Sequence, residues 1–177
     1  MAVTRIIGNL CAGPDIDVKT FINYGLLPSM KAFLDRIPIK DEIIKELMWI
    51  ASNIAACKNE SFIGKLFEYK IIDKAIDILK TSQVEGLIQE SEIIVSHCCN
   101  HGGMIILKKL VELGIIGILL NVMRVHSNQD ITVRGIDVYL EILTKCKNDD
   151  DIRLVLETSG VHAFVLNVIT SKYTEIS

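Results

Sequence analysis

Apolar residues recur every three to four positions along most of the chain, the spacing that places side chains on one face of an α-helix. No stretch shows the sustained alternation of apolar and polar residues that marks a half-buried strand. The sequence therefore indicates an all-α fold. The predicted helices cover residues 3–12, 15–24, 27–37, 41–56, 60–69, 71–81, 86–100, 103–113, 115–126, 130–146, 149–158 and 160–171.

A short motif recurs between these helices. Four-residue segments beginning at residues 25, 70, 114 and 160 read GLLP, KIID, GIIG and GVHA, so their starts lie 45, 44 and 46 residues apart. A glycine at this place suits the left-handed end of a helix. The period is typical of stacked three-helix repeats, in which one unit cannot bury its apolar face alone. We predict one repeat domain over residues 1–177: the end of a repeat (1–13), full repeats (14–57, 58–102, 103–147) and a partial repeat (148–177).

Several polar residues and prolines stand where predicted helices begin or end. Pro14 and Asp15 suit a first turn, and Asp130 and Asp149 can cap the helices after them. Pro38 separates the second and third helices of the first full repeat.

The first predicted helix carries apolar residues with no predicted partner. Ile6, Ile7 and Leu10 lie on it, and a terminal repeat without a polar cap exposes its stacking face. We therefore expect a segment of a longer protein, or a face that is covered by another partner or by self-association through the exposed repeat ends.

Composition narrows the classes of function. Half of the 177 residues are hydrophobic and the net charge is −3, which gives no global basic field for nucleic acid. The longest apolar run, residues 113–123, is too short to span a bilayer, and no secretory leader is recognisable. An odd number of cysteines favours free buried thiols in a reducing compartment over a disulfide framework. The five cysteines are Cys11, Cys57, Cys98, Cys99 and Cys146.

Trp49 and Asn53 are the residues that most directly indicate binding chemistry. They are four residues apart in the helix predicted over 41–56, so they lie one turn apart on the same face. An indole can hold the aliphatic stem of Lys or Arg and attract its charge. The Asn amide can donate and accept together, which suits the backbone of an extended ligand. The pair therefore predicts a peptide-binding groove, although a lone Trp in a helical repeat can also be a core residue.

Three segments resemble importin-α, the adapter for nuclear localisation signals. Residues 5–15 (RIIGNLCAGPD) are similar to its sixth armadillo repeat, 45–54 (KELMWIASNI) to the third helix of its seventh, and 107–114 (LKKLVELG) to the opening of its ninth. The similarity runs in order over most of the chain and weakens after about Asn128. The resemblance implies an armadillo-type right-handed superhelical solenoid of about four repeats, incomplete at both ends.

The resemblance also implies a peptide-binding site in a concave groove. Asn9, Trp49 and Asn53 match the family's ladder, while Glu46 and Asp15 match acidic groove positions. The arginine stands at the tryptophan position of the sixth repeat, as in the family, and the serine adjoins the second asparagine. The implied site residues are Arg5, Asn9, Asp15, Glu46, Trp49, Ser52 and Asn53.

The following repeat departs from the family pattern. One alignment places Ile94 and Cys98 at the Trp and Asn positions, and a shift of one residue places Ile93 and His97 there instead. Neither restores the pair. In the first alignment the acidic position falls on Ser91, between two glutamates.

Metal binding and catalysis are weakly supported. His97 and His101 share a helical face, but Cys98 and Cys99 point elsewhere, so one helix cannot close a tetrahedral zinc site. The sequence has no glycine-rich phosphate loop after a strand, and no nucleophile–base set can be assembled. We expect no cofactor, no metal and no enzymatic activity.

The sequence thus favours an adapter that binds basic nuclear localisation signals, in cytoplasm and nucleus. By family analogy the partners are basic cargo, importin-β and an exportin, with no nucleic acid and no membrane. Two alternatives remain: an armadillo scaffold that has lost signal binding, and a structural end-cap of a longer solenoid.

Overall fold

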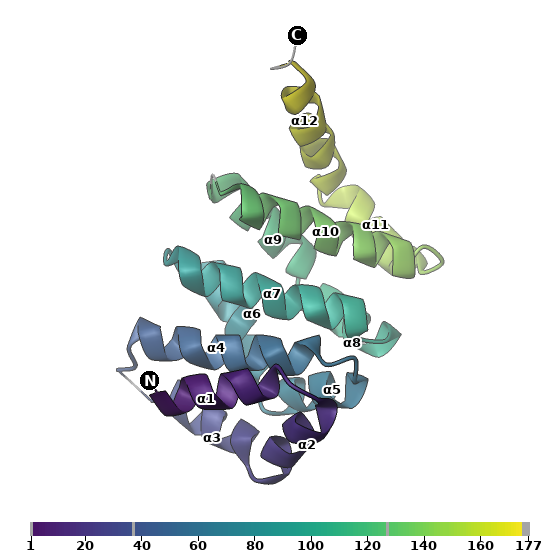
Figure 1. Ribbon diagram of the computed structural model, residues 1–177. Coiled ribbons are helices and arrows are strands. Elements are labelled where there is room, and N and C mark those ends of the chain that lie inside the picture. Colours follow the sequence, from purple (N-terminus) through teal and green to yellow (C-terminus); the bar gives the residue numbers. More distant parts are fainter. Residues whose placement is uncertain (1, 37, 127, 175–177) are drawn as a thin grey trace. The chain divides into compact units, whose positions relative to one another are not determined.

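The computed structural model describes residues 2–36, 38–126 and 128–174, with side chains up to residue 170. These residues form twelve helices and no strand (Figure 1), which confirms the all-α prediction. The helices are α1 (Ala2–Cys11), α2 (Asp15–Asn23), α3 (Leu26–Leu34), α4 (Asp41–Ala56), α5 (Glu60–Glu68), α6 (Ile71–Thr81), α7 (Glu85–His101), α8 (Met104–Glu112), α9 (Ile115–Val125), α10 (Gln129–Lys145), α11 (Asp150–Thr158) and α12 (Val161–Thr174).

The observed bounds follow the apolar spacing closely. Helices α4 and α6 begin and end at the predicted residues. Helix α3 ends at Leu34, earlier than predicted, and Ile37 lies outside the described residues. The early end is consistent with Pro38, because a proline disfavours the helical conformation of the residue before it.

Left-handed residues separate the first and second helices of each repeat. Gly25, Gly114 and Gly160 have φ of 87°, 83° and 78°, as the turn motif predicts. Lys70 occupies the same place before α6 with φ of 59°. A side chain is strained in this conformation, so this turn forms without the residue that best fits it.

Side chains cap two of the later helices. Asp149 accepts the Ile152 N–H at 3.2 Å and caps α11, as predicted. The prediction for Asp130 is wrong, because Asn128 is the N-cap of α10. The Asn128 Oδ1 accepts the N–H groups of Asp130 and Ile131 at 2.8 and 3.3 Å, which places Asp130 inside the first turn.

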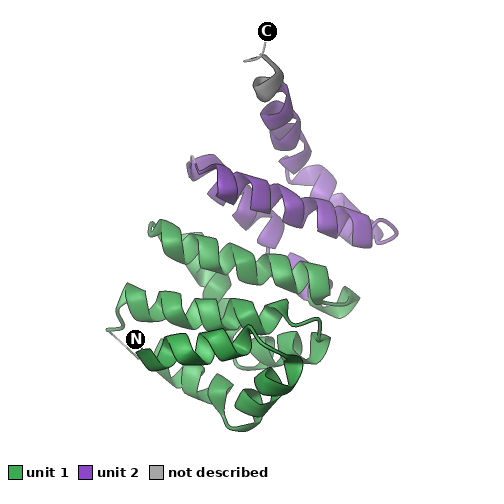
Figure 2. Cartoon of the chain, viewed as in Figure 1, with its two compact units in different colours: residues 1–106 green, residues 107–177 purple. Residues whose placement is uncertain are grey.

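The chain divides into two compact units, residues 1–106 and 107–177 (Figure 2). In the first unit α4 packs between α1 and α7, and α6 packs against α7 (Figure 1). In the second unit α9 packs against α10, and α12 against α9 and α11. The boundary falls inside α8, close to the predicted start of a repeat at residue 103. A single continuous repeat domain stays a prediction.

All five cysteines are free and buried, which agrees with the prediction from their odd number. Among the residues that the structure describes, no single helix is long and apolar enough to cross a membrane. The pair Asp150–Thr158 and Val161–Thr170 meets that criterion together, but it is bent by 55° at its break.

Candidate functional site

Trp49 and Asn53 lie half-buried on α4, on the side that faces α1. The indole of Trp49 rests on Gly8 of α1 so closely that a Cβ there would lie 2.2 Å from its Cζ3. Real Cβ atoms do not approach a ring to that distance, so the missing side chain of Gly8 makes room for the indole. Gly8 is therefore part of the site. The sequence prediction did not include this residue.

The side-chain amide of Asn53 already makes one hydrogen bond within the protein. Its Nδ2 donates a hydrogen bond of 2.9 Å to the Gly8 carbonyl and so joins α4 to α1. An amide group has two N–H donors and an acceptor oxygen, so one donor and the oxygen are left for a ligand. Asn9 of α1 is exposed, and its side chain hydrogen-bonds to none of the residues that the structure describes.

Arg5 and Glu46 form an ion pair between α1 and α4. Arg5 Nε donates to Glu46 Oε1 at 3.1 Å; the Arg5 side chain is 66% exposed and the Glu46 side chain 14%. Glu46 Oε2 is buried and has no hydrogen-bond partner among the residues that the structure describes. The charge of the predicted acidic residue is therefore partly neutralised by the neighbouring arginine.

Four predicted residues come together in one hollow of about 300 Å³, called here the Trp49 pocket. Two further residues line it that the prediction omitted. Lys45 precedes Trp49 by one helical turn, and this spacing could have identified it. Glu90 comes from α7. The pocket is lined by Arg5, Asn9, Lys45, Glu46, Trp49 and Glu90.

Asp15 and Asn53 meet in a second hollow of about 340 Å³, the Asn53 pocket. Its wall includes Cys11 and Cys57. Burial, and then the charge of Asp15 beside it, raise the pKa of the Cys57 thiol to about 11. Burial also raises the pKa of Cys11 to about 11, with a smaller contribution from Cys57. These thiols are poor nucleophiles at neutral pH, because the thiolate is the reactive form.

Ser52 supports the helix rather than the groove. Its side chain is buried, and its Oγ donates a 2.8 Å hydrogen bond to the Trp49 carbonyl. With its hydroxyl turned to the backbone of its own helix, Ser52 presents no polar atom to a ligand, and we leave it out of the candidate site.

The structure decides between the two alignments of α7. Ile94 and Cys98 are fully buried, so they belong to the core, whereas Ile93 and His97 are half-buried like Trp49 and Asn53. The first alignment was therefore wrong by one residue. The structural offset is 44 residues, which is also the offset from Asn9 to Asn53.

With this offset of 44 residues, Glu46 corresponds to Glu90 in the next repeat. The acidic position is thus retained, while the Trp and Asn positions become Ile93 and His97. The His97 ring stacks on His101 with centroids 5.8 Å apart. Among the described residues, no group of three or more His, Cys, Asp or Glu side chains could hold a metal ion.

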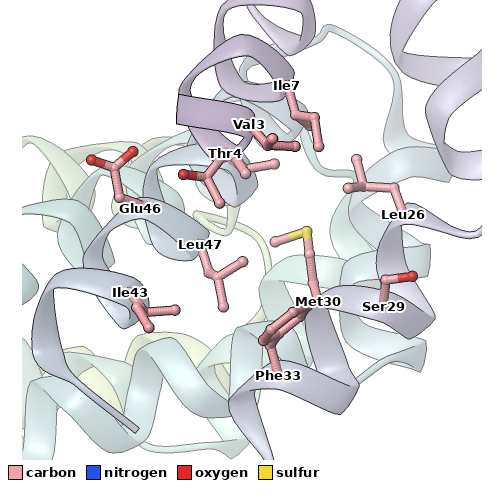
Figure 3. A pocket seen from close by; sticks show the side chains of 11 residues that line it. Val3, Thr4, Ile7, Leu26, Ser29, Met30, Phe33, Ile43, Glu46 and Leu47 are labelled. Carbon is pink, nitrogen blue, oxygen red and sulfur yellow. The ribbon is translucent and has the colours of Figure 1, made fainter. Parts of the chain in front are cut away.

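An apolar pocket of about 320 Å³ lies between α1, α3 and α4, and Glu46 is the one predicted site residue that lines it (Figure 3). Leu26, Met30 and Phe33 of α3 line it, together with Val3 and Ile7 of α1. The neighbouring side chains of Ile6 and Leu10 are 59% and 43% exposed. Self-association through this end of the chain stays a prediction.

Comparison with known proteins defines the class of fold. No protein-family model matches the chain, and neither does any curated protein sequence. Solved structures do: a designed armadillo repeat protein in complex with the peptide (KR)4 has a TM-score of 0.78 and 21% identity over 90% of this chain. The designed armadillo repeat protein YIII(Dq)4CqI has a TM-score of 0.76 and 22% identity over 89%.

A structure of computationally designed armadillo repeat proteins for modular peptide recognition is similar to the same degree, with a TM-score of 0.76. The chain therefore has the fold of armadillo-repeat proteins. It spans 62% to 63% of the length of these designed proteins.

Proposed function

We propose that this chain is a non-catalytic adapter that binds an extended peptide across α1, α4 and α7. The Trp49 pocket carries the proposal, because a half-buried indole, an exposed Asn9 and two carboxylates line one hollow. The indole face can hold the stem of a basic side chain and attract its charge. The amides of Asn9 and Asn53 can pair with the peptide backbone.

The finer form of the proposal is that the ligand is a basic nuclear localisation signal and that the chain serves nuclear import. The resemblance of residues 5–15 and 45–54 to importin-α supports it. A fold shared with a designed protein in complex with (KR)4 is consistent with it. In this form importin-β and an exportin are partners of the whole protein, which moves between cytoplasm and nucleus.

A titration of a fluorescein-labelled bipartite basic peptide tests the proposal. We expect binding that weakens with salt, and a loss of at least about tenfold in affinity for Trp49→Ala, as for a central aromatic residue of an interface. Tyr24→Ala is the matched control, because Tyr24 is an aromatic residue outside both pockets with 87% exposure. Equal affinity of the two variants for the peptide would contradict binding at Trp49.

A second function has two specific observations in its favour. In the next repeat, Ile93 and His97 stand at the positions of Trp49 and Asn53. In addition, Arg5 already forms an ion pair with Glu46. Both features weaken the hold on a basic peptide, as expected of an armadillo scaffold that has lost signal binding. Absence of peptide binding even at low salt would favour this scaffold over the adapter.

A further inference from the structure

The accessible charge of the Trp49 pocket differs from its formal charge. Formally two cations, Arg5 and Lys45, balance two carboxylates, Glu46 and Glu90. The cations reach solvent, since Arg5 is 66% exposed at its side chain and Lys45 is exposed. Each carboxylate has a buried Oε2 atom. The most exposed charged groups of the pocket are therefore its two cations.

Most N–H donors of Arg5 and Lys45 form no hydrogen bond or ion pair with the described residues. Arg5 uses its Nε–H for Glu46, and its Nη groups hold further donors in the same planar fork. Lys45 forms no ion pair with any residue in the described part of the chain. Its ammonium lies at Gly86, where a Cβ would come within 2.8 Å of the Nζ. The pocket thus holds an exposed lysine of α4, one helical turn before Trp49, that has no ion-pair partner among the described residues.

We propose that the Trp49 pocket selects a peptide of mixed charge, with a basic side chain on Trp49 and an acidic side chain within two residues, paired with Lys45 and Arg5. The inference rests on the proposed peptide-binding function and names the ligand class of that site. A purely basic peptide brings further positive charge beside these exposed cations. A mixed peptide leaves the balance unchanged and satisfies the free donors, and such electrostatic complementarity determines specificity.

Two labelled octapeptides, (KKEE)2 and (KR)4, test the inference by fluorescence anisotropy at 150 mM salt. Opposite charges stand two residues apart in the first, on the same side of an extended strand. We expect (KKEE)2 to bind more tightly to the full chain than (KR)4. Lys45→Glu should weaken (KKEE)2 by about fivefold and strengthen (KR)4, the size expected for a single accessible charge pair.

Lys80→Glu on α6 is the control, because it changes the net charge equally at an exposed residue outside the pocket. If Lys45→Glu does not fold, Lys45→Gln should still reduce the preference for (KKEE)2. Tighter binding of (KR)4, with equal effects of the Lys45 and Lys80 variants, would overturn the inference. Binding of both peptides unchanged by Trp49→Ala, or no binding of either, would overturn the proposed function as well.

Discussion

At the scale of single residues, the backbone of Gly8 connects the two side chains that indicate binding. Its carbonyl accepts the Asn53 hydrogen bond, and its Cα lies under the Trp49 ring. One position of α1 therefore determines where both groups of α4 lie. Substitution at Gly8 should affect the site more than the loss of either contact alone.

Gly8→Ala should lower the free energy of unfolding by about 1–3 kcal/mol, the usual effect of overpacking a close contact. Urea unfolding followed by circular dichroism measures it. Gly64→Ala in α5 is the control, because a Cβ there meets nothing within 4 Å. That variant should gain up to about 1 kcal/mol from helix propensity alone. Equal stabilisation by the two substitutions would contradict the packing of Trp49 on Gly8.

Spacing in the sequence identifies Trp49 and Asn53 as neighbours on one helical face, since that relation is local. The partners of these residues are not local. Gly8 and Arg5 reach α4 only through the packing of helices, since Gly8 is 45 residues from Asn53 and Arg5 is 41 residues from Glu46. The same limit applies to Ser52, whose burial depends on the neighbouring helices.

At the scale of elements, Lys70 is the turn residue that fits its conformation least well. It is the one non-glycine residue with positive φ in the described part of the chain. Its ion pair with Asp73, at 3.5 Å between exposed side chains, offsets little of the strain.

Lys70→Gly should stabilise the protein by about 1 kcal/mol, because a glycine removes the left-handed strain. Thermal unfolding measures the change. Lys80→Gly makes the same substitution within α6 and should destabilise by up to about 1 kcal/mol. A lower melting temperature for Lys70→Gly would show that the turn does not carry this strain.

Asn128→Ala should destabilise the protein by about 1 kcal/mol, because two N–H groups of α10 lose their cap. Asp130→Ala should change the stability by less than about 0.5 kcal/mol, since Asp130 lies inside the first turn. Chemical unfolding of both variants compares them. A larger loss of stability for Asp130→Ala than for Asn128→Ala would show that Asp130 is the cap.

Helix positions were predictable because the left-handed turns and the apolar spacing agree along the chain. The exact cap of α10 was not, since Asn128 and Asp130 are both suited to cap and stand two residues apart. The register of α7 was not predictable either. Glu90, Ser91 and Glu92 offer acidic or polar residues at three consecutive positions, and only burial separates the groove side from the core.

At the scale of the whole molecule, every cysteine is a buried thiol, and burial raises the pKa values of Cys11, Cys57, Cys98 and Cys146. For Cys11 and Cys57 the folded value is about 11 against an ordinary 9.0. Because the pKa is raised on folding, the associated stability is complete below pH 9 and is lost as the pH rises through about 11.

Alkylation at pH 8 should therefore be slow for all five thiols in the folded protein and complete in guanidinium chloride. The rates at Cys11 and Cys57 should rise steeply between pH 9 and 11, with values measured by mass spectrometry after peptide digestion. Rapid labelling of either at pH 8 would show that its thiol is not held protonated by burial.

The placement of Trp49 gives the molecule an intrinsic optical reporter. The sequence contains one tryptophan, and its half-buried indole lines the candidate pocket. The emission of the whole protein therefore reports on the surroundings of one ring. Unlabelled peptides that enter the pocket should shift or quench this emission.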